Sequence, residues 1–124
     1  MPQKILIVDD NDTNRTLFRD VLRYHGYETI EADNGELGIQ QAIQHTPDLI
    51  LLDIQMPVMD GYKALKTLRE MPETRNIRVV ALTSFAMSGD DKRIMAAGFD
   101  GYIAKPISTR ELPVVVRKYL EAKE

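Results

Sequence analysis

The stretch from Leu49 to Asp53 most constrains the fold of this chain, because four consecutive apolar residues end abruptly in one carboxylate. A short apolar run rich in branched side chains is typical of a strand buried on both faces, as in parallel sheets. The next segment contains Pro57 and an Asp60–Gly61 pair, which predicts a turn-rich loop and ends the strand at Asp53. Ligands of open parallel sheets bind at the carboxyl ends of strands, so Asp53 lies where chemistry is expected.

The same alternation of apolar runs and amphipathic segments continues along the whole chain. Strands are predicted over residues 5–8, 28–32, 49–53, 79–83 and 102–104, and helices over about 12–25, 35–45, 62–71, 88–97 and 108–120. This order predicts an α/β fold with a doubly wound, flavodoxin-like, five-stranded parallel sheet of order 2-1-3-4-5 and helices on both faces. No repeat or linker interrupts it, so we expect residues 1–124 to form a single domain.

Local details of the helices follow from single residues. We expect Asp12 or Thr13 to cap the first helix and Ser88, with Asp91, to cap the fourth. Leu37, Ala42 and Ile43 of the second helix are expected to face the core. Pro113 is expected to distort the start of the last helix or to kink it, because proline lacks the N–H that helical turns use.

Composition narrows the range of functions. A net charge of -3 and a pI near 5.4 provide no basic surface for nucleic acid. The chain has no cysteine, so neither disulfides nor thiolate metal sites form. No stretch approaches the roughly 20 apolar residues that span a bilayer. We therefore expect a soluble cytoplasmic protein that binds neither nucleic acid nor membranes.

Polar side chains follow four of the predicted strands at the point where each strand ends. They are Asp9 and Asp10, Asp53, Thr83 and Lys105. The first and third strands are neighbours in the predicted order, about 4.8 Å apart, so the three carboxylates crowd together. Two such charges about 5 Å apart repel by roughly 3 kcal/mol at an effective dielectric near 20. The cluster is better explained as a site for Mg²⁺, with Mn²⁺ as the alternative, than as scaffolding.

Thr83 and Lys105 extend this cation site into one that suits a phosphoryl group. A hydroxyl and an ammonium take up charge on phosphoryl oxygens, while a carboxylate attacks phosphorus. Asp53 is the predicted nucleophile, because it stands alone on the central strand. Each residue also has a plain structural explanation: the Asp pair as a turn or cap, Lys105 as a solvated surface charge. The coincidence of all four motifs at strand ends favours the functional interpretation.

Four segments in this order and spacing resemble the receiver domain of the two-component response regulator family. They are ILIVDDN, DLILLDIQMPVMDG, VVALTSFAM and GYIAKPI, and the likeness covers essentially the full chain. The VDDNxxNR pattern and the FAM after Thr83 look most like stand-alone, single-domain regulators and the receivers of hybrid kinases. Ser84 stands where the family most often has alanine.

The resemblance implies a metal-dependent phosphoacceptor site. Asp9 and Asp10 resemble the acidic Mg²⁺ ligands, Asp53 the aspartate that accepts the phosphoryl group, and the backbone carbonyl of Gln55 a further metal ligand.

The resemblance also implies a switch beside that site. Thr83 and Tyr102 resemble the switch pair, and Lys105 the phosphate-contacting lysine, whose bond to Pro106 is commonly cis. Tyr102 has a plain explanation too, as a half-buried aromatic residue on an edge strand.

The implied function is signalling by a domain that catalyses only its own phosphorylation and dephosphorylation. A histidine kinase or histidine phosphotransfer protein is the expected donor, and it is expected to dock at the first helix and the loops around Asn11, Met56 and Pro106. Contact with a downstream protein is the expected output, with Phe85, Met87 and Met95 as candidate contact residues. The alternative is a receiver domain excised from a hybrid histidine kinase. A haloacid dehalogenase-type phosphatase is a rival from another class, but it carries a second Asp two residues after the nucleophile, where this chain has Gln55. A flavin-binding module needs a phosphate-binding loop after the first strand, where this chain is acidic.

Overall fold

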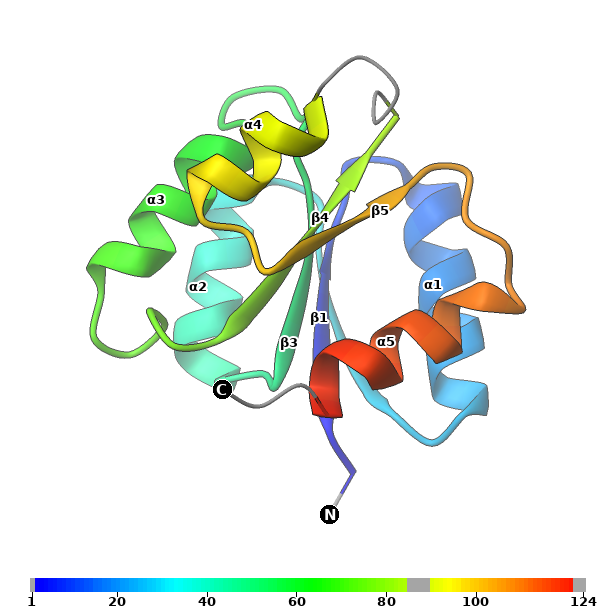
Figure 1. Ribbon diagram of the computed structural model, residues 1–124. Helices are drawn as coiled ribbons and strands as arrows, with labels where there is room; N and C mark the ends of the chain where they lie inside the picture. The colour runs from blue at the N-terminus through cyan, green and yellow to red at the C-terminus, as the bar shows by residue number, and fades with distance from the viewer. Residues whose placement is uncertain (1, 85–89, 122–124) are drawn as a thin grey trace.

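Five strands alternate with five helices in the computed structural model, which describes residues 2–84 and 90–121 (Figure 1). The strands are β1 (Lys4–Val8), β2 (Glu28–Ala32), β3 (Leu49–Asp53), β4 (Arg78–Thr83) and β5 (Gly101–Ala104). The helices are α1 (Asp12–Tyr24), α2 (Gly35–His45), α3 (Gly61–Glu70), α4 (Asp90–Ala97) and α5 (Glu111–Glu121). Each strand and each helix predicted from the sequence is therefore present.

The five strands form one parallel sheet in the order β2-β1-β3-β4-β5, which confirms the predicted topology. Figure 1 shows α1 and α5 on one face of this sheet and α2, α3 and α4 on the other. The order reverses between β1 and β3, which are neighbours although β2 lies between them in sequence. In a doubly wound sheet, the crevice at this reversal is where ligands bind.

The core lies on both faces of the sheet, because the central strands are buried on both sides. Every residue of β3 is buried, whereas β2 at the edge is only partly so. Apolar residues of β1 alternate between the two faces: Ile5 and Ile7 pack towards α1 and α5, and Leu6 and Val8 towards α2 and α3. This alternation follows from the period of two in a strand.

Two predictions about helices α1 and α2 were wrong. Asn11, not Asp12 or Thr13, caps α1, because Asn11 has an extended backbone and its side chain accepts a hydrogen bond from the Asn14 amide at 3.0 Å. Of the three α2 residues predicted to face the core, Ala42 is buried, but Leu37 and Ile43 are 36% and 39% exposed.

Small residues occupy the buried side of α2 in place of Leu37 and Ile43. They are Gly35, Gly38 and Ala42. A Cβ on Gly38 would lie 2.9 Å from a methyl carbon of Val8, so the helix lies too close to β1 for a larger side chain there. The close approach explains why Leu37 and Ile43 turn outwards, while Ile39 and Ala42 pack against the core.

Helix α5 begins at Glu111, three residues after Ser108, whose Oγ accepts hydrogen bonds from the amides of Arg110 and Glu111 at 3.1 Å each. Pro113 is the third residue of the helix, where an N–H has no helical acceptor. The missing N–H of Pro113 therefore removes no helical hydrogen bond, which takes away the reason for the expected distortion.

The predicted cap at Ser88 lies outside the described residues. Within the described ranges, no helix is both long enough and apolar enough to cross a membrane.

Candidate functional site

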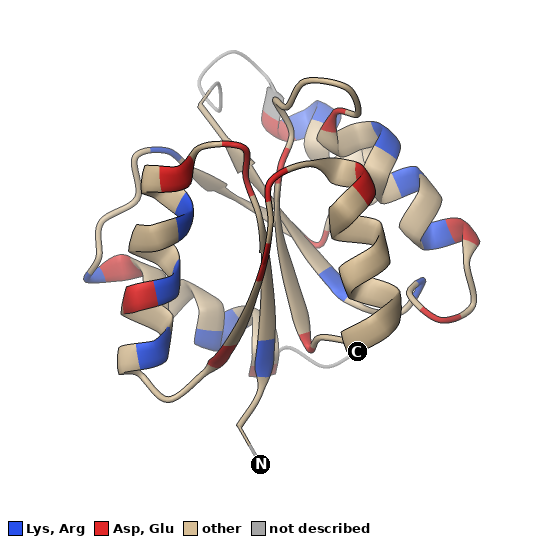
Figure 2. Cartoon of the chain, turned by 180° about the vertical axis from the view of Figure 1, so that it is seen from behind, with Lys and Arg blue, Asp and Glu red and all other residues tan. Residues whose placement is uncertain are grey.

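The register of the sheet brings the polar residues at the strand ends to one edge. Val8 pairs with Leu52, so Asp9 and Asp53 follow side by side. Leu82 pairs with Asp53 on the other side of β3. Because β4 and β5 continue this edge, Thr83 and Lys105 lie along the same row of strand ends. Acidic segments accordingly border the upper end of the sheet in Figure 2.

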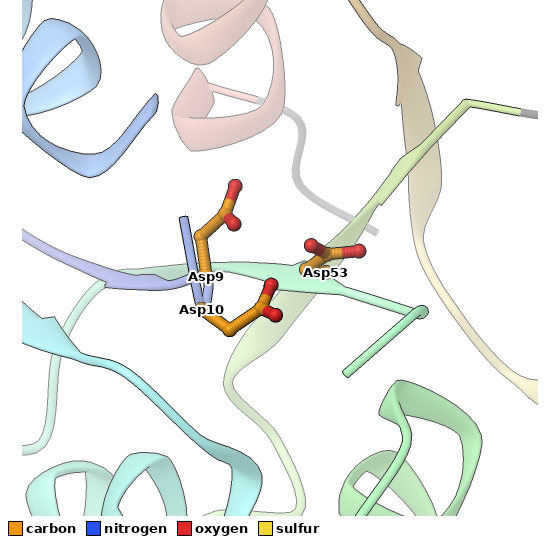
Figure 3. Close-up of side chains that lie close together, drawn as sticks. All are labelled: Asp9, Asp10 and Asp53. Atoms are coloured by element: carbon orange, nitrogen blue, oxygen red, sulfur yellow. The ribbon is translucent and has the colours of Figure 1, made fainter. Parts of the chain in front are cut away.

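Asp9, Asp10 and Asp53 form a compact acidic cluster at this edge. One carboxylate oxygen of each residue lies within 4.8 Å of those of the other two. Figure 3 shows the carboxylates around a common space between the ends of β1 and β3. Asp9 is fully buried and Asp53 is 4% exposed, whereas Asp10 is exposed. The predicted proximity of the three acids is therefore present.

The carboxylate of Asp53 is held at both of its oxygens. Oδ1 accepts a hydrogen bond of 2.9 Å from the backbone amide of Gln55, and Oδ2 accepts one of 2.9 Å from Nζ of Lys105. The glycine at the start of α3 also supports Asp53, because a Cβ on Gly61 would lie 2.6 Å from the Asp53 carbonyl oxygen and 2.5 Å from Cα of Ile54. The loop after β3 therefore closes tightly onto the end of the strand.

Asp9 has one satisfied and one unsatisfied carboxylate oxygen. Oδ1 accepts a hydrogen bond of 2.9 Å from the Asn11 amide. Oδ2 lies 3.1 Å from Nζ of Lys105 as an ion pair, and it is buried and accepts no hydrogen bond in the described part of the chain. Buried polar oxygens are usually hydrogen-bonded, so this oxygen is a candidate ligand for a cation or a water.

Burial and neighbouring charges shift the pKa values of Asp53 and Lys105. Burial raises the pKa of Asp53, the hydrogen bonds and charge of Gln55 and Lys105 oppose that rise, and the charge of Asp9 adds to it. Burial alone would lower the pKa of Lys105, but its hydrogen bond to Asp53 and the negative charges of Asp53 and Asp9 outweigh burial and raise the pKa. Burial therefore decides the direction of the shift at Asp53, whereas the neighbouring carboxylates decide it at Lys105.

These donors fit a hard divalent cation. The three carboxylates supply only oxygen, which suits Mg²⁺ or Mn²⁺ rather than Zn²⁺. Oδ2 of Asp9, which accepts no hydrogen bond in the described part of the chain, offers the kind of acceptor that a cation or a water bound to it satisfies. The residues present are therefore compatible with magnesium.

The remaining predicted residues lie on β4 and β5 or just after β3 and β5. Thr83 is fully buried at the end of β4, and its carbonyl oxygen accepts a hydrogen bond of 2.7 Å from the Lys105 amide. Tyr102 is 36% exposed on β5. The peptide bond between Lys105 and Pro106 is cis. The amide of Gln55 contacts Asp53, while the metal-ligand role of its carbonyl stays a prediction.

Two features of the site did not emerge from the sequence reasoning. One is the close approach of Gly61, for which the Asp60–Gly61 pair was a signal, since Asp60 caps α3 by accepting from the Lys63 amide. The other is Arg15, whose guanidinium donates a hydrogen bond of 2.8 Å to the carbonyl of Asp9. The spacing within VDDNxxNR was the available signal for Arg15.

Comparison with known proteins gives a consistent picture. The family model described as the response regulator receiver domain matches residues 5–117. The polar-differentiation response regulator DivK of Brucella anthropi is 45% identical over 120 residues, which cover 97% of this chain and 98% of the relative. DivK of Brucella ovis is 43% identical over the same shares of the two chains.

Solved structures agree with these sequence relatives. The receiver domain of sensor histidine kinase PA1611 from Pseudomonas aeruginosa PAO1 has a TM-score of 0.90 and 33% identity, over 98% of this chain and 100% of that one. That structure has a magnesium ion coordinated in its active-site cleft. The chemotaxis protein CheY4 of Vibrio cholerae has a TM-score of 0.90 and 26% identity, over 96% and 99% of the two chains.

Proposed function

The chain belongs to the response regulator receiver domain family, and on that premise we propose that Asp53 accepts a phosphoryl group in a Mg²⁺-dependent signalling reaction. The domain proposed for this role is residues 1–124. The single observation that supports the proposal most strongly is the position of the Asp53 carboxylate, which lies at the end of the central strand, facing two further acids and bonded to one ammonium. A phosphoryl acceptor needs a fixed nucleophile with positive charge beside it.

The transfer exchanges one bond to phosphorus for another. An oxygen of the Asp53 carboxylate forms a bond to phosphorus, and the bond between phosphorus and the donor's histidine nitrogen breaks. The imidazole leaves with the electron pair of the broken bond, and Asp53 becomes an acyl phosphate. The amide of Gln55 and the ammonium of Lys105 orient the carboxylate for this attack, since they contact its two oxygens.

Charge is the second requirement of the transfer. Asp9, Asp10, Asp53 and the carbonyl of Gln55 would hold Mg²⁺, which when bound offsets negative charge on phosphoryl oxygens. Lys105 contributes a positive charge of its own, and its raised pKa keeps it protonated at neutral pH. The ammonium is thus available to the phosphoryl group as well as to the carboxylate.

The output of the reaction is a change in the surface formed by α4, β5 and α5. Thr83 is buried beside the acceptor and Tyr102 is half-exposed two strands from it. We propose that the Thr83 hydroxyl moves towards the new phosphoryl oxygens and that Tyr102 moves with it, which biases a two-state arrangement.

A groove of about 250 Å³ lined by Tyr102, Pro106 and Val115, among others, lies on this surface and suits a downstream protein. Met95 of α4, 49% exposed, is a candidate contact. The candidate contacts Phe85 and Met87 lie outside the described residues.

The proposed donor is a histidine kinase or a histidine phosphotransfer protein in the cytoplasm. Its binding surface is the acceptor edge together with the exposed side of α1 around Leu17, which is 38% exposed. The loop at Met56 was also a candidate, but the side chain of Met56 is buried, so its neighbours would make the contact. Stand-alone regulators and a receiver of a sensor kinase are both among the similar proteins, and the chemistry at Asp53 is the same in either setting.

Intact-mass analysis after incubation with acetyl phosphate and Mg²⁺ tests this function. The wild-type chain is expected to gain one phosphoryl group, and Asp53→Asn is expected to gain none. Asp48→Asn is the matched control, because Asp48 precedes β3 at the opposite end from Asp53 and accepts a hydrogen bond from the Lys4 amide. A wild-type chain without an adduct, or an Asp53→Asn chain with one, contradicts the proposal. Sustained release of phosphate from a monoester would favour the phosphatase instead.

A further inference from the structure

Arg15 of α1 contacts the metal-binding end of β1 without belonging to the acidic cluster. Its side chain is 15% exposed, and each guanidinium nitrogen has its own acceptor. Nη1 donates to the backbone carbonyl of Asp9 at 2.8 Å, and Nε donates to a carboxylate oxygen of Glu31 on β2 at 3.4 Å. Nη2 is paired with the carboxylate of Asp12. The guanidinium therefore joins β1, β2 and the first turn of α1.

The carbonyl that Arg15 holds belongs to the peptide unit between Asp9 and Asp10. Because a peptide unit is planar, fixing its oxygen also fixes the direction in which the chain leaves Asp9 and enters Asp10. The neighbouring groups are fixed too: the Asp9 amide donates to the Ala32 carbonyl at 3.1 Å, and the Asn11 amide donates to Asp9 Oδ1 at 2.9 Å. Of the two acids joined by this peptide unit, Asp10 is the exposed one, so it depends most on the direction of the backbone.

We propose that Arg15 is a positioning residue for the cation site, which sets the orientation of Asp10 relative to Asp53. This inference rests on the proposed function, because it concerns how tightly the site holds Mg²⁺. Contacts to three acceptors in three directions require the planar, forked set of N–H donors of a guanidinium, which lysine does not have. Glu31 holds one side of the Arg15 guanidinium, and the other carboxylate oxygen of Glu31 lies 3.5 Å from Nη1 of Arg19.

The sign of the effect separates positioning from simple electrostatics. Arg15 is a positive charge near a site for a cation, so removing it should tighten Mg²⁺ binding if charge alone matters. If Arg15 positions the acids, removing it should weaken Mg²⁺ binding despite the loss of repulsion. Arg15→Lys keeps the charge and loses the fork, so positioning predicts weaker binding for this variant as well.

Calorimetric titration with MgCl₂, without a phosphoryl donor, measures this difference. Arg15→Gln is expected to bind Mg²⁺ on the order of tenfold more weakly than wild type, as is typical when an outer partner of a metal ligand is lost. Arg15→Lys is expected to recover only part of that loss. Arg23→Gln is the matched control, since it removes the same charge from the same helix and its guanidinium donates to Thr29 Oγ1 at 2.8 Å, outside the network of Arg15 and Glu31. Arg23→Gln is expected to bind Mg²⁺ as wild type does.

A second readout needs no metal. Amide hydrogen exchange in EDTA should be faster at Asp10 and Asn11 in Arg15→Gln than in wild type, while the amides of β4 exchange at wild-type rates, which shows that the fold is retained. Unchanged or tighter Mg²⁺ binding by Arg15→Gln, or unchanged exchange at these two amides, overturns the role of Arg15. Failure of the wild-type chain to bind Mg²⁺ overturns the proposed function instead, and the exchange rates then still decide whether Arg15 positions the backbone.

Discussion

Lys105 Nζ lies 2.9 Å from Oδ2 of Asp53 and 3.1 Å from Oδ2 of Asp9, so one ammonium bridges the ends of two neighbouring strands. Both carboxylates are almost completely buried, and the side chain of Lys105 is 15% exposed. Removing one partner of such a group leaves the other charges uncompensated, which is more costly than losing an exposed ion pair.

Lys105→Met is therefore expected to lower the free energy of unfolding by roughly 3 kcal/mol in EDTA. Saturating Mg²⁺ should restore a large part of that loss, because a divalent cation supplies charge to the same acids. Urea unfolding with and without Mg²⁺ measures both effects, with the exposed Lys66→Met on α3 as the control. Equal stability of the two variants in EDTA would show that the bridge does not stabilise the fold.

The pH dependence of stability follows from the direction of two pKa shifts. The folded-state pKa of Asp53 is raised above 3.8, mainly by burial. Its contribution to stability is therefore complete below pH 3.8 and is lost as pH rises through the folded-state pKa. The pKa of Lys105 is raised above 10.5 despite burial, by Asp53 and Asp9. Its contribution is present below pH 10.5 and is lost in more alkaline solution.

Comparison of the metal-free wild type with Asp53→Asn isolates the acidic part of this profile. The unfolding free energy of wild type, relative to the variant, is expected to fall as pH rises above 3.8 and then to level off. Urea titrations across the acidic and neutral range provide the measurement. A relative stability of wild type that increases with pH would mean that attraction to Lys105 outweighs burial.

Magnesium should stabilise the chain through the acidic cluster. At a concentration one hundred times its Kd, Mg²⁺ is expected to add about 2.7 kcal/mol to the unfolding free energy. Asp10→Asn should weaken Mg²⁺ binding by about tenfold, since a contact to a charged group contributes roughly 1.5 kcal/mol. Because the Asp10 side chain is exposed, the Asp10→Asn variant should retain the fold. Thermal melts against MgCl₂ measure the effect, with the exposed Glu73→Gln as a charge-matched control; equal shifts in both variants would argue against a ligand role for Asp10.

Gly61 and Gly35 provide a test of the packing beneath Asp53. Each is the first residue of its helix, after a capping Asp60 or Asn34. A Cβ on Gly61 would lie 2.5 Å from Cα of Ile54, whereas a Cβ on Gly35 would lie 3.1 Å from the sulfur of Met59, a flexible side chain, and equally far from its carbonyl oxygen. Gly61→Ala is expected to cost about 1–3 kcal/mol of stability, and Gly35→Ala clearly less. Urea unfolding of the pair decides; similar costs would contradict the tight contact at the end of β3.

The strands and their order were predictable, because the apolar runs indicate buried strands and the polar residues after them mark where the strands end. The run from Leu49 to Leu52 indicates burial on both faces, and parallel pairing then aligns Asp53 with Asp9. The close approach of α2 was not predictable in this way. Gly38 permits that approach, but the pattern of apolar residues predicts that the helix buries Leu37 rather than its glycines.

The network around Arg15 illustrates why part of the site escapes sequence reasoning. Arg15 and Glu31 are distant in sequence, and their contact depends on where α1 crosses the edge of the sheet. Likewise, whether Asn11 or Asp12 caps α1 depends on the backbone conformation at Asn11, since both residue types are good caps. Residue type and spacing identify candidate capping residues and contacts, but the three-dimensional path of the backbone determines which of them form.

The most direct test of the account is the position of the phosphoryl group. Sodium borohydride reduces an acyl phosphate to an alcohol, so a phosphorylated aspartate becomes homoserine at one position of the chain. Peptide mapping after incubation with acetyl phosphate and Mg²⁺, followed by borohydride, should find homoserine at position 53, and none when Mg²⁺ is replaced by EDTA. Homoserine at position 9 or 10, or at no position, would contradict the assignment of Asp53 as the acceptor.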